Sequence, residues 1–230
     1  MHGFTRRRLL TFAATLPLSL ALPLWARAVS SPEVALQPAY AVTKSTLKKA
    51  FHAEMAAHLH YQAFIPTALA VNFANIAYMF RTFSISEKIH ADNYQRVLRS
   101  LDNNIMTKNI KLRVADTQTN IQAAADKELE KIETFYPELL GRLEGESHDE
   151  AILNCMYSWK SHRQHEAKIL EIQKYSGFFF EGMAGQIEDM KMDFHICEVC
   201  GSTIDEIPLT SCDICKNSMT HYRPVARPVA

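Results

Sequence analysis

Apolar side chains recur at steps of three and four residues in four long stretches of the chain, which is the spacing of one face of an α-helix. These stripes predict helices at about residues 43–66, 72–101, 117–140 and 147–177. Proline has no backbone N–H, so we expect Pro66 to end or kink the first helix. The run Ser147-His148-Asp149-Glu150 predicts a capped start for the fourth helix, and Gly177 predicts its end.

Ionisable side chains interrupt the apolar stripes at matched places. In each half of the chain a lone glutamate is followed, 33 or 34 residues later, by two ionisable residues three positions apart. The second pair of helices thus repeats the first, which predicts an all-α main domain, a ferritin-like four-helix bundle with pseudo-two-fold symmetry. The residues of this repeat are Glu54, Glu87, His90, Glu128, His162 and His165.

These residue types favour a metal site in the core of the bundle. A buried carboxylate is unfavourable unless it is paired or binds metal. Carboxylates combined with imidazoles suit iron or manganese, and this number of ligands favours two ions bridged by a glutamate. A single buried glutamate is more often a salt-bridge partner, and a single core histidine is usually structural, but the repeat favours metal. His58 shares a face with Glu54 and is a further candidate, and Cys155 is either a packing residue or an extra soft ligand.

Four cysteines near the C-terminus predict a second metal site. Cys197-x-x-Cys200 and Cys212-x-x-Cys215 are separated by eleven residues, and two such pairs make a closed tetrathiolate site. Iron and zinc both accept a tetrahedral shell of sulfur. Gly201 suits the tight knuckle whose backbone N–H groups point at sulfur. In an exported protein, two disulfides are the alternative.

The charge balance and the glycine content exclude some partners and favour a helical fold. Its 25 basic and 25 acidic residues balance, so neither nucleic acid nor an anionic membrane is an expected partner. Seven glycines in 230 residues favour helices over a turn-rich β fold.

The expected segments are a signal peptide at 1–28, a flexible segment at 29–42, the bundle at 43–177, a linker at 178–193, the four-cysteine module at 194–222 and a disordered tail at 223–230.

The N-terminus is typical of an export signal. Thr5-Arg6-Arg7-Arg8-Leu9-Leu10 is a twin-arginine start, and Ala26-Arg27-Ala28 is a cleavage pattern. The apolar run between them is too short and too broken for a membrane span. We expect export by the twin-arginine route, cleavage near Ala28 and a periplasmic location; an ordinary signal peptide or an uncleaved anchor is the alternative. Proteins with such signals are exported folded, so metal could be loaded before the thiolates meet an oxidising compartment.

From Thr43 to Tyr222, the chain resembles a rubrerythrin, a ferritin-like diiron bundle followed by a rubredoxin-like domain. The matching residues are Glu54 with Tyr61 seven positions on, Glu87-Lys88-Ile89-His90-Ala91, Asn120-Ile121-Gln122-Ala123-Ala124 leading to Glu128, Tyr136-Pro137, and the four cysteines of the C-terminal module. The resemblance implies a non-haem iron peroxidase. Such a protein reduces hydrogen peroxide at the diiron site with electrons relayed through the tetrathiolate iron, often as a homodimer or higher homo-oligomer.

The resemblance also implies roles for single residues. Glu87 is expected to bridge two irons, with Glu54 and Glu128 as terminal ligands. Tyr61, and with it Tyr94, is expected to hydrogen-bond the ligand carboxylates. The expected catalytic residues are therefore Glu54, Glu87, Glu128 and Tyr61, and the remaining metal ligands are His90, His162 and His165.

Two positions depart from the family pattern. The family has Glu-x-x-Glu on the third helix, where this chain has Glu128-x-x-Lys131, and Glu-x-x-His on the fourth, where it has His162-x-x-His165. Lys131 could pair with Glu128 or extend to solvent. These changes keep alternatives open: a metal-binding or electron-transfer protein with a non-catalytic bundle, or a protein that oxidises and handles iron. The electron donor is not identified by the sequence.

Overall fold

A computed structural model of the chain describes residues 39–174 and 184–229. The expected signal peptide, residues 29–38 of the flexible segment, the helix stop at Gly177 and the first part of the linker lie outside the described residues. Ala41 and Val42, which were also expected in the flexible segment, are already helical.

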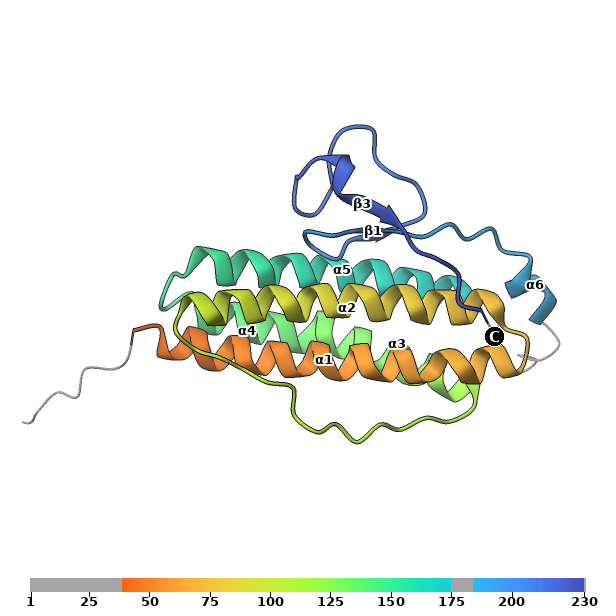
Figure 1. Cartoon of the computed structure of the whole chain (residues 1–230), viewed down its shortest axis with the longest axis horizontal. Coiled ribbons are helices and arrows are strands. Elements are labelled where there is room, and N and C mark those ends of the chain that lie inside the picture. Colours follow the sequence, from red (N-terminus) through yellow and green to blue (C-terminus); the bar gives the residue numbers. More distant parts are fainter. Residues whose placement is uncertain (1–38, 175–183, 230) are drawn as a thin grey trace, which may run out of the picture. The chain divides into compact units, whose positions relative to one another are not determined.

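Four long helical rods form the main body, as the apolar stripes predict (Figure 1). The first two are α1 (Ala41–Ala70) and α2 (Ala74–Ser100). The third consists of α3 (Thr117–Glu130), a π-helical turn η1 (Lys131–Phe135) and α4 (Tyr136–Leu143), and the fourth is α5 (Asp149–Gln173). Residues 103–116 cross from α2 to α3 without helix or strand.

Three local expectations need correction. α1 continues past Pro66 to Ala70. α5 is capped by His148, whose ring accepts a hydrogen bond from the N–H of Ala151, because Ser147 adopts a left-handed φ of 49° outside the helix. The third helix is interrupted by the π turn, and the indole of Trp159 donates a 2.8 Å hydrogen bond to the carbonyl oxygen of Ile132 inside that turn. Such turns are frequent at functional sites.

The core of the bundle has a polar layer between two apolar clusters. One cluster contains Tyr61, Phe80 and Phe83, and the other contains Phe51 and Leu98. On α2, Glu87 and His90 lie in sequence between the members of the two clusters, and on α1 Glu54 lies between Phe51 of one cluster and Tyr61 of the other. The apolar packing on both sides thereby holds a group of charged side chains out of water.

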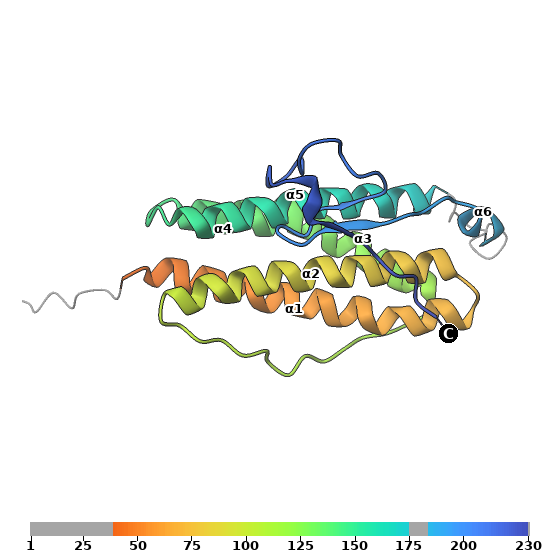
Figure 2. The same cartoon turned by 45° about the horizontal axis from the view of Figure 1, so that its top comes forward.

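The C-terminal module is a small antiparallel sheet with strand order β2-β1-β3. Its strands are β1 (His195–Cys197), β2 (Thr203–Ile204) and β3 (Tyr222–Pro224), and the 3-10 turn η3 (Met219–His221) precedes β3. Figures 1 and 2 both draw the module beside α2 and α5, on the side of the bundle opposite the 103–116 crossover.

Hydrogen bonds fix the first cysteine knuckle of the module to the bundle. The carbonyl oxygen of Gly201 accepts from Ser86 Oγ of α2 at 2.7 Å and from Ser161 Oγ of α5 at 2.9 Å. The carbonyl oxygen of Val199 accepts from Asn93 Nδ2 at 2.9 Å. Gly201 has a φ of 77°, a conformation that suits glycine.

The segments on either side of the module are more ordered than the sequence suggested. The tail was expected to be disordered from residue 223, but β3 reaches Pro224, and Arg227 Nη1 donates to Asn75 Oδ1 at 2.8 Å. In the expected linker, α6 (Ala184–Glu188) packs near the start of α2, where the Glu188 carboxylate accepts from the N–H of Asn75 at 3.0 Å. Asn75 thus ties both segments to the bundle.

Within the described residues, no helix combines the length and the apolar character that a membrane span requires.

The knuckle contact predicts a large effect of Gly201→Ala. A Cβ at this position would lie 2.4 Å from His90 Nε2, and alanine disfavours the left-handed φ. We expect the free energy of unfolding, measured by urea denaturation, to fall by more than about 1 kcal/mol. Gly145→Ala is the matched control, because a Cβ there meets nothing within 4 Å. Equal stability of the two variants would contradict the packing described.

Candidate metal centres

The structure brings the six residues of the sequence repeat together in the centre of the bundle. All six side chains are buried, and they come from α1, α2, α3 and α5. His162 lies at the middle of the group: its Nδ1 is 2.6 Å from Glu128 Oε2 and 3.5 Å from Glu87 Oε1, and its Nε2 is 3.4 Å from Glu54 Oε1. The predicted convergence of these side chains is therefore confirmed by geometry.

The six residues form two overlapping groups with the spacing of metal ligands. In each group, one ligand atom per residue lies within 4.8 Å of all the others. Glu87 and His162 belong to both groups. We call the first group position A (Glu54, Glu87, His90 and His162) and the second group position B (Glu87, Glu128, His162 and His165).

Position B has polar atoms without a hydrogen-bond partner. Glu87 Oε1 and His165 Nδ1 are buried and make no hydrogen bond with the described residues. They lie 3.5 Å apart, which is longer than a normal hydrogen bond. Buried polar atoms are nearly always satisfied, so these two atoms fit a site whose remaining partner is a metal ion.

In position A, the ammonium group of Lys131 contacts two of the carboxylates. Its Nζ donates to Glu54 Oε2 at 2.6 Å and lies 3.5 Å from Glu87 Oε2. The residue is 6% exposed. Of the two arrangements the sequence left open, neither holds: Lys131 does not extend to solvent, and its hydrogen bond is to Glu54 instead of Glu128.

Two tyrosines bind the carboxylates from outside. Tyr61 donates to Glu128 Oε1 at 2.5 Å, as expected. Tyr94 instead donates to Ser158 Oγ at 2.7 Å, and the hydroxyl that binds Glu54 belongs to Tyr136. The Tyr136-Pro137 pair belongs to the family resemblance and is the signal in the sequence that points to Tyr136, but the spacing of residues does not indicate its contact with Glu54.

The charges of the cluster sustain one another. Burial alone would raise the pKa of Glu87, but His162 and Lys131 hold it well below its usual value. Burial would likewise raise the pKa of Glu128, which His162 and His165 hold low. Conversely, burial would lower the pKa of His162, but Glu87 and Glu128 raise it to about 10. Without metal, the two carboxylates are ionised and His162 is a cation.

The other two candidate ligands stay apart from this cluster. His58 Nδ1 lies 2.8 Å from the carbonyl oxygen of Ser84. Cys155 is buried in the apolar cluster with Phe51 and Leu98, where burial raises the pKa of its thiol to about 12. Neither belongs to a metal-ligand group among the described residues.

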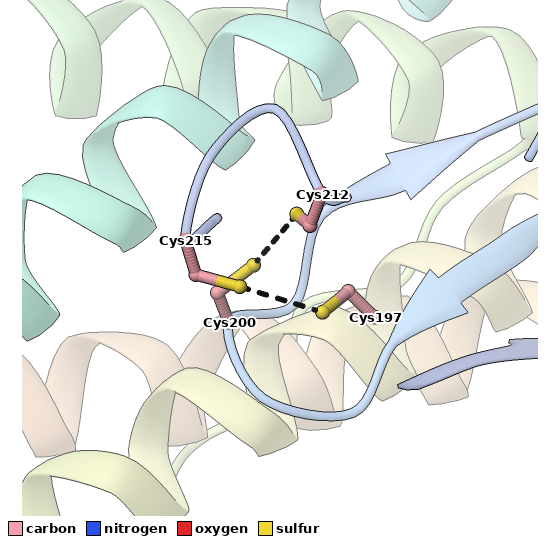
Figure 3. A group of neighbouring side chains, drawn as sticks. All are labelled: Cys197, Cys200, Cys212 and Cys215. Carbon is pink, nitrogen blue, oxygen red and sulfur yellow. Dashed lines mark hydrogen bonds between the residues drawn. The ribbon is translucent and has the colours of Figure 1, made fainter. Parts of the chain in front are cut away.

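Four buried cysteine side chains of the module point at one centre (Figure 3). The Sγ atoms of Cys197 and Cys215 are 3.8 Å apart, and those of Cys200 and Cys212 are 3.6 Å apart. No disulfide joins them. A tetrahedral ion with metal–sulfur bonds of about 2.3 Å needs sulfur atoms about 3.8 Å apart. The separations therefore fit a tetrathiolate site for iron or zinc and do not fit the disulfide alternative.

The two loops that carry the cysteine pairs, which we call the first and second knuckles, have the same backbone form. In the first, the N–H of Gly201 donates to the carbonyl of Cys197 at 2.9 Å, and in the second the N–H of Lys216 donates to the carbonyl of Cys212 at 2.9 Å. Lys216 adopts a left-handed φ of 63°, close to that of Gly201. Tyr222 adds a hydrogen bond of 3.2 Å to Cys212 Sγ. The lysine in the second knuckle thus leaves its geometry intact.

One imidazole contacts both centres. His90 Nε2 lies 3.1 Å from the carbonyl oxygen of Cys200, and its Nδ1 lies 3.1 Å from Glu87 Oε2. Burial lowers the pKa of His90, which favours the neutral ring that a metal ligand requires. His165 has a related arrangement, with its Nε2 3.4 Å from Thr203 Oγ1 of the module. Sequence reasoning missed these contacts because they join residues far apart in the chain.

Comparisons with known proteins agree with this architecture. The family model "Rubrerythrin" matches residues 45–172. Rubrerythrin-2 of Clostridium acetobutylicum is 28% identical over 178 residues, which are 76% of this chain and 92% of the relative.

Among solved structures, nigerythrin in a mixed-valence state has a TM-score of 0.67 at 18% identity, over 94% of this chain and all of the other. The bacterioferritin of Desulfovibrio desulfuricans has a TM-score of 0.59 at 17% identity, over 63% of this chain and 85% of the other. These likenesses show the fold, a ferritin-like bundle, and the nigerythrin match extends over the C-terminal module.

The family match spans more than half of the chain and includes every residue of positions A and B. The bundle and the four-cysteine module have the order and the geometry that the resemblance implied. The chain therefore belongs to the rubrerythrin family, a family of iron-binding proteins of the oxidoreductase type.

Proposed function

We propose that this protein reduces hydrogen peroxide at the bundle site with electrons that enter through the four-cysteine site. The observation that carries the proposal is the double contact of His90, which joins a cysteine backbone to a bundle carboxylate in one chain. Reduction of hydrogen peroxide consumes two electrons and two protons and yields two water molecules. The two centres therefore need an electronic connection and a supply of protons.

Iron bound at both centres would supply the one-electron chemistry. Nigerythrin, with the same fold, has been studied in a fully reduced, all-ferrous state. In this chain, the residues of positions A and B would hold the bundle iron, and the four cysteines would hold the other ion. Cys200 and His90 are linked by a single hydrogen bond, so the connection between the centres involves few atoms.

A cavity of about 480 Å³ gives small molecules a route toward the bundle site. It lies between α1 and α3, and its wall includes Ala57 and Ala124. Tyr61 and Lys131 also line it, and both bind site carboxylates on their other side. The Lys131 ammonium has donors beyond the one bound to Glu54 and is suited to orienting a peroxide and passing protons toward it, and the Tyr61 hydroxyl, whose proton goes to Glu128, can accept a hydrogen bond.

The second candidate is a metal-binding or electron-transfer protein with a non-catalytic bundle. The observation that favours it is the ion pair between Lys131 and Glu54, which places a cation where the family pattern has a ligand. The third alternative, iron oxidation and handling, predicts oxidation of ferrous iron by dioxygen without a preference for peroxide.

Location and assembly are part of the same proposal. We infer export to the periplasm by the twin-arginine route from the first 28 residues of the sequence. Export in the folded state would protect the four thiolates from pairing as disulfides. The homo-oligomer that the family resemblance implies stays a prediction.

Glu87→Gln is expected to slow the reaction with peroxide. Glu87 belongs to both positions, and an amide is a poorer ligand than a carboxylate, so metal affinity should fall by at least about 10–100-fold, the typical cost of losing an outer partner of a metal ligand. The protein is reduced without oxygen and mixed with hydrogen peroxide, and the return of the thiolate-to-iron absorption is followed. The natural protein should recover rapidly and the variant slowly.

Glu133→Gln is the control for this experiment, because Glu133 is exposed on η1. It should behave like the natural protein. If the natural protein, loaded with iron, is not reoxidised by peroxide, the peroxidase proposal is wrong and the electron-transfer alternative gains. Faster oxidation by dioxygen than by peroxide would favour iron oxidation.

Cys212→Ser tests the entry of electrons. This variant should lose the thiolate-to-iron absorption and lose turnover with an external one-electron donor, because the tetrathiolate site is incomplete. A bundle that has been reduced chemically should still react with peroxide. Cys155→Ala, which changes a cysteine outside the site, should keep both properties. Undiminished turnover of Cys212→Ser would exclude the four-cysteine site as the route of electrons.

A further inference from the structure

Lys131 takes a place among the ligands of position A. Its ammonium lies 2.6 Å from Glu54 Oε2 and 3.5 Å from Glu87 Oε2, two carboxylates that position A offers to a metal ion. Both contacts are ion pairs between the buried ammonium and a buried carboxylate. An ion in position A and the ammonium would therefore compete for the same two carboxylates.

Position B shares only Glu87 with the ion pairs of Lys131. Among the described residues, Lys131 has no ion pair with Glu128. Glu87 Oε1 and His165 Nδ1, both buried ligand atoms of position B, have no hydrogen-bond partner among the described residues. The same glutamate thus turns one oxygen toward the lysine and leaves the other available to an ion.

The charges of the cluster favour one ion. Glu54, Glu87 and Glu128 together carry three negative charges. The Lys131 ammonium and one divalent ion supply three positive charges when the histidines bind as neutral ligands. A second divalent ion beside a retained ammonium would leave an excess of positive charge in a buried site, which is strongly unfavourable.

We propose that Lys131 serves as an internal counter-ion that makes the two metal positions unequal: position B binds the first ion, and position A binds a second only when that ion displaces Lys131 from Glu54. Lys131 lines the cavity between α1 and α3, so the displaced side chain has space to enter. This deepens the proposed metal site and rests on it.

The test counts ions without measuring activity. Metal-free full-length protein is titrated with Co²⁺ without oxygen, and the intense thiolate bands are separated from the weak bands of the bundle site. The natural protein should bind one ion in the module and one in the bundle. The second bundle ion should bind about a hundredfold or more weakly than the first, because the Lys131 ammonium repels it. Like charges about 4 Å apart in a partly screened interior repel each other on this scale.

Lys131→Gln should bind two bundle ions with similar affinities, because the competing charge is gone. Lys131→Arg keeps the positive charge and should bind one bundle ion firmly. Lys127→Gln is the matched control: Lys127 lies in α3, one turn before Lys131, but its partner is the exposed Glu130, and the variant should match the natural protein.

Two bundle ions of equal affinity in the natural protein, or a single ion in Lys131→Gln, would overturn the proposal. If Lys131→Gln does not fold without metal, it is refolded with Co²⁺, and the ions retained per chain are counted after gel filtration. Three ions would support the proposal and two would overturn it. Because the count does not depend on peroxide, a failure here is distinguishable from an absence of peroxidase activity.

Discussion

The burial of three carboxylates in the middle of a helical bundle is the constraint on which the rest of the structure depends. Glu54, Glu87 and Glu128 are all inaccessible to water. Removing one partner from such a buried ionic group typically destabilises a protein by about 3–5 kcal/mol. Each carboxylate therefore has a close cationic neighbour: Lys131 for Glu54 and for Glu87, and His162 for Glu128. A metal ion would take over part of this role.

The four-cysteine module completes that polar layer from outside the bundle. The carbonyl of Gly201 accepts hydrogen bonds from serines of both α2 and α5, the two helices that carry the histidines of the site. The carbonyl of Cys200 holds the outer nitrogen of His90. Outer partners of this kind fix the orientation of a ligand imidazole. The module is therefore both a second candidate metal centre and a support for the first.

Local patterns were sufficient to predict which candidate ligands come together. The spacing of Glu87 and His90 places both on one helical face, and the four cysteines stand at the intervals of a tetrathiolate site, so both sets could be found without a structure. The alignment of the two halves of the chain then predicted the bundle. Each of these features depends only on the spacing of residues along the chain.

Features that depend on distant contacts were not predictable in the same way. The partner of Lys131 is Glu54, 77 residues away, and its burial depends on packing at the π turn, which the apolar stripe of the third helix does not indicate. The role of Tyr136 likewise depends on contact with α1. The tail looked disordered because Arg223 to Ala230 is rich in proline and basic residues, but Arg227 is held by Asn75 of α2.

The central claim is that one chain holds two unequal bundle positions and a thiolate site, linked through His90. Anomalous X-ray diffraction from crystals of the natural protein, grown with iron at two ions per chain, tests it most directly. The account predicts one strong peak among the four cysteines and one in position B, with Lys131 against Glu54. Two equal peaks in the bundle with Lys131 turned away, or a bundle without metal, would contradict it.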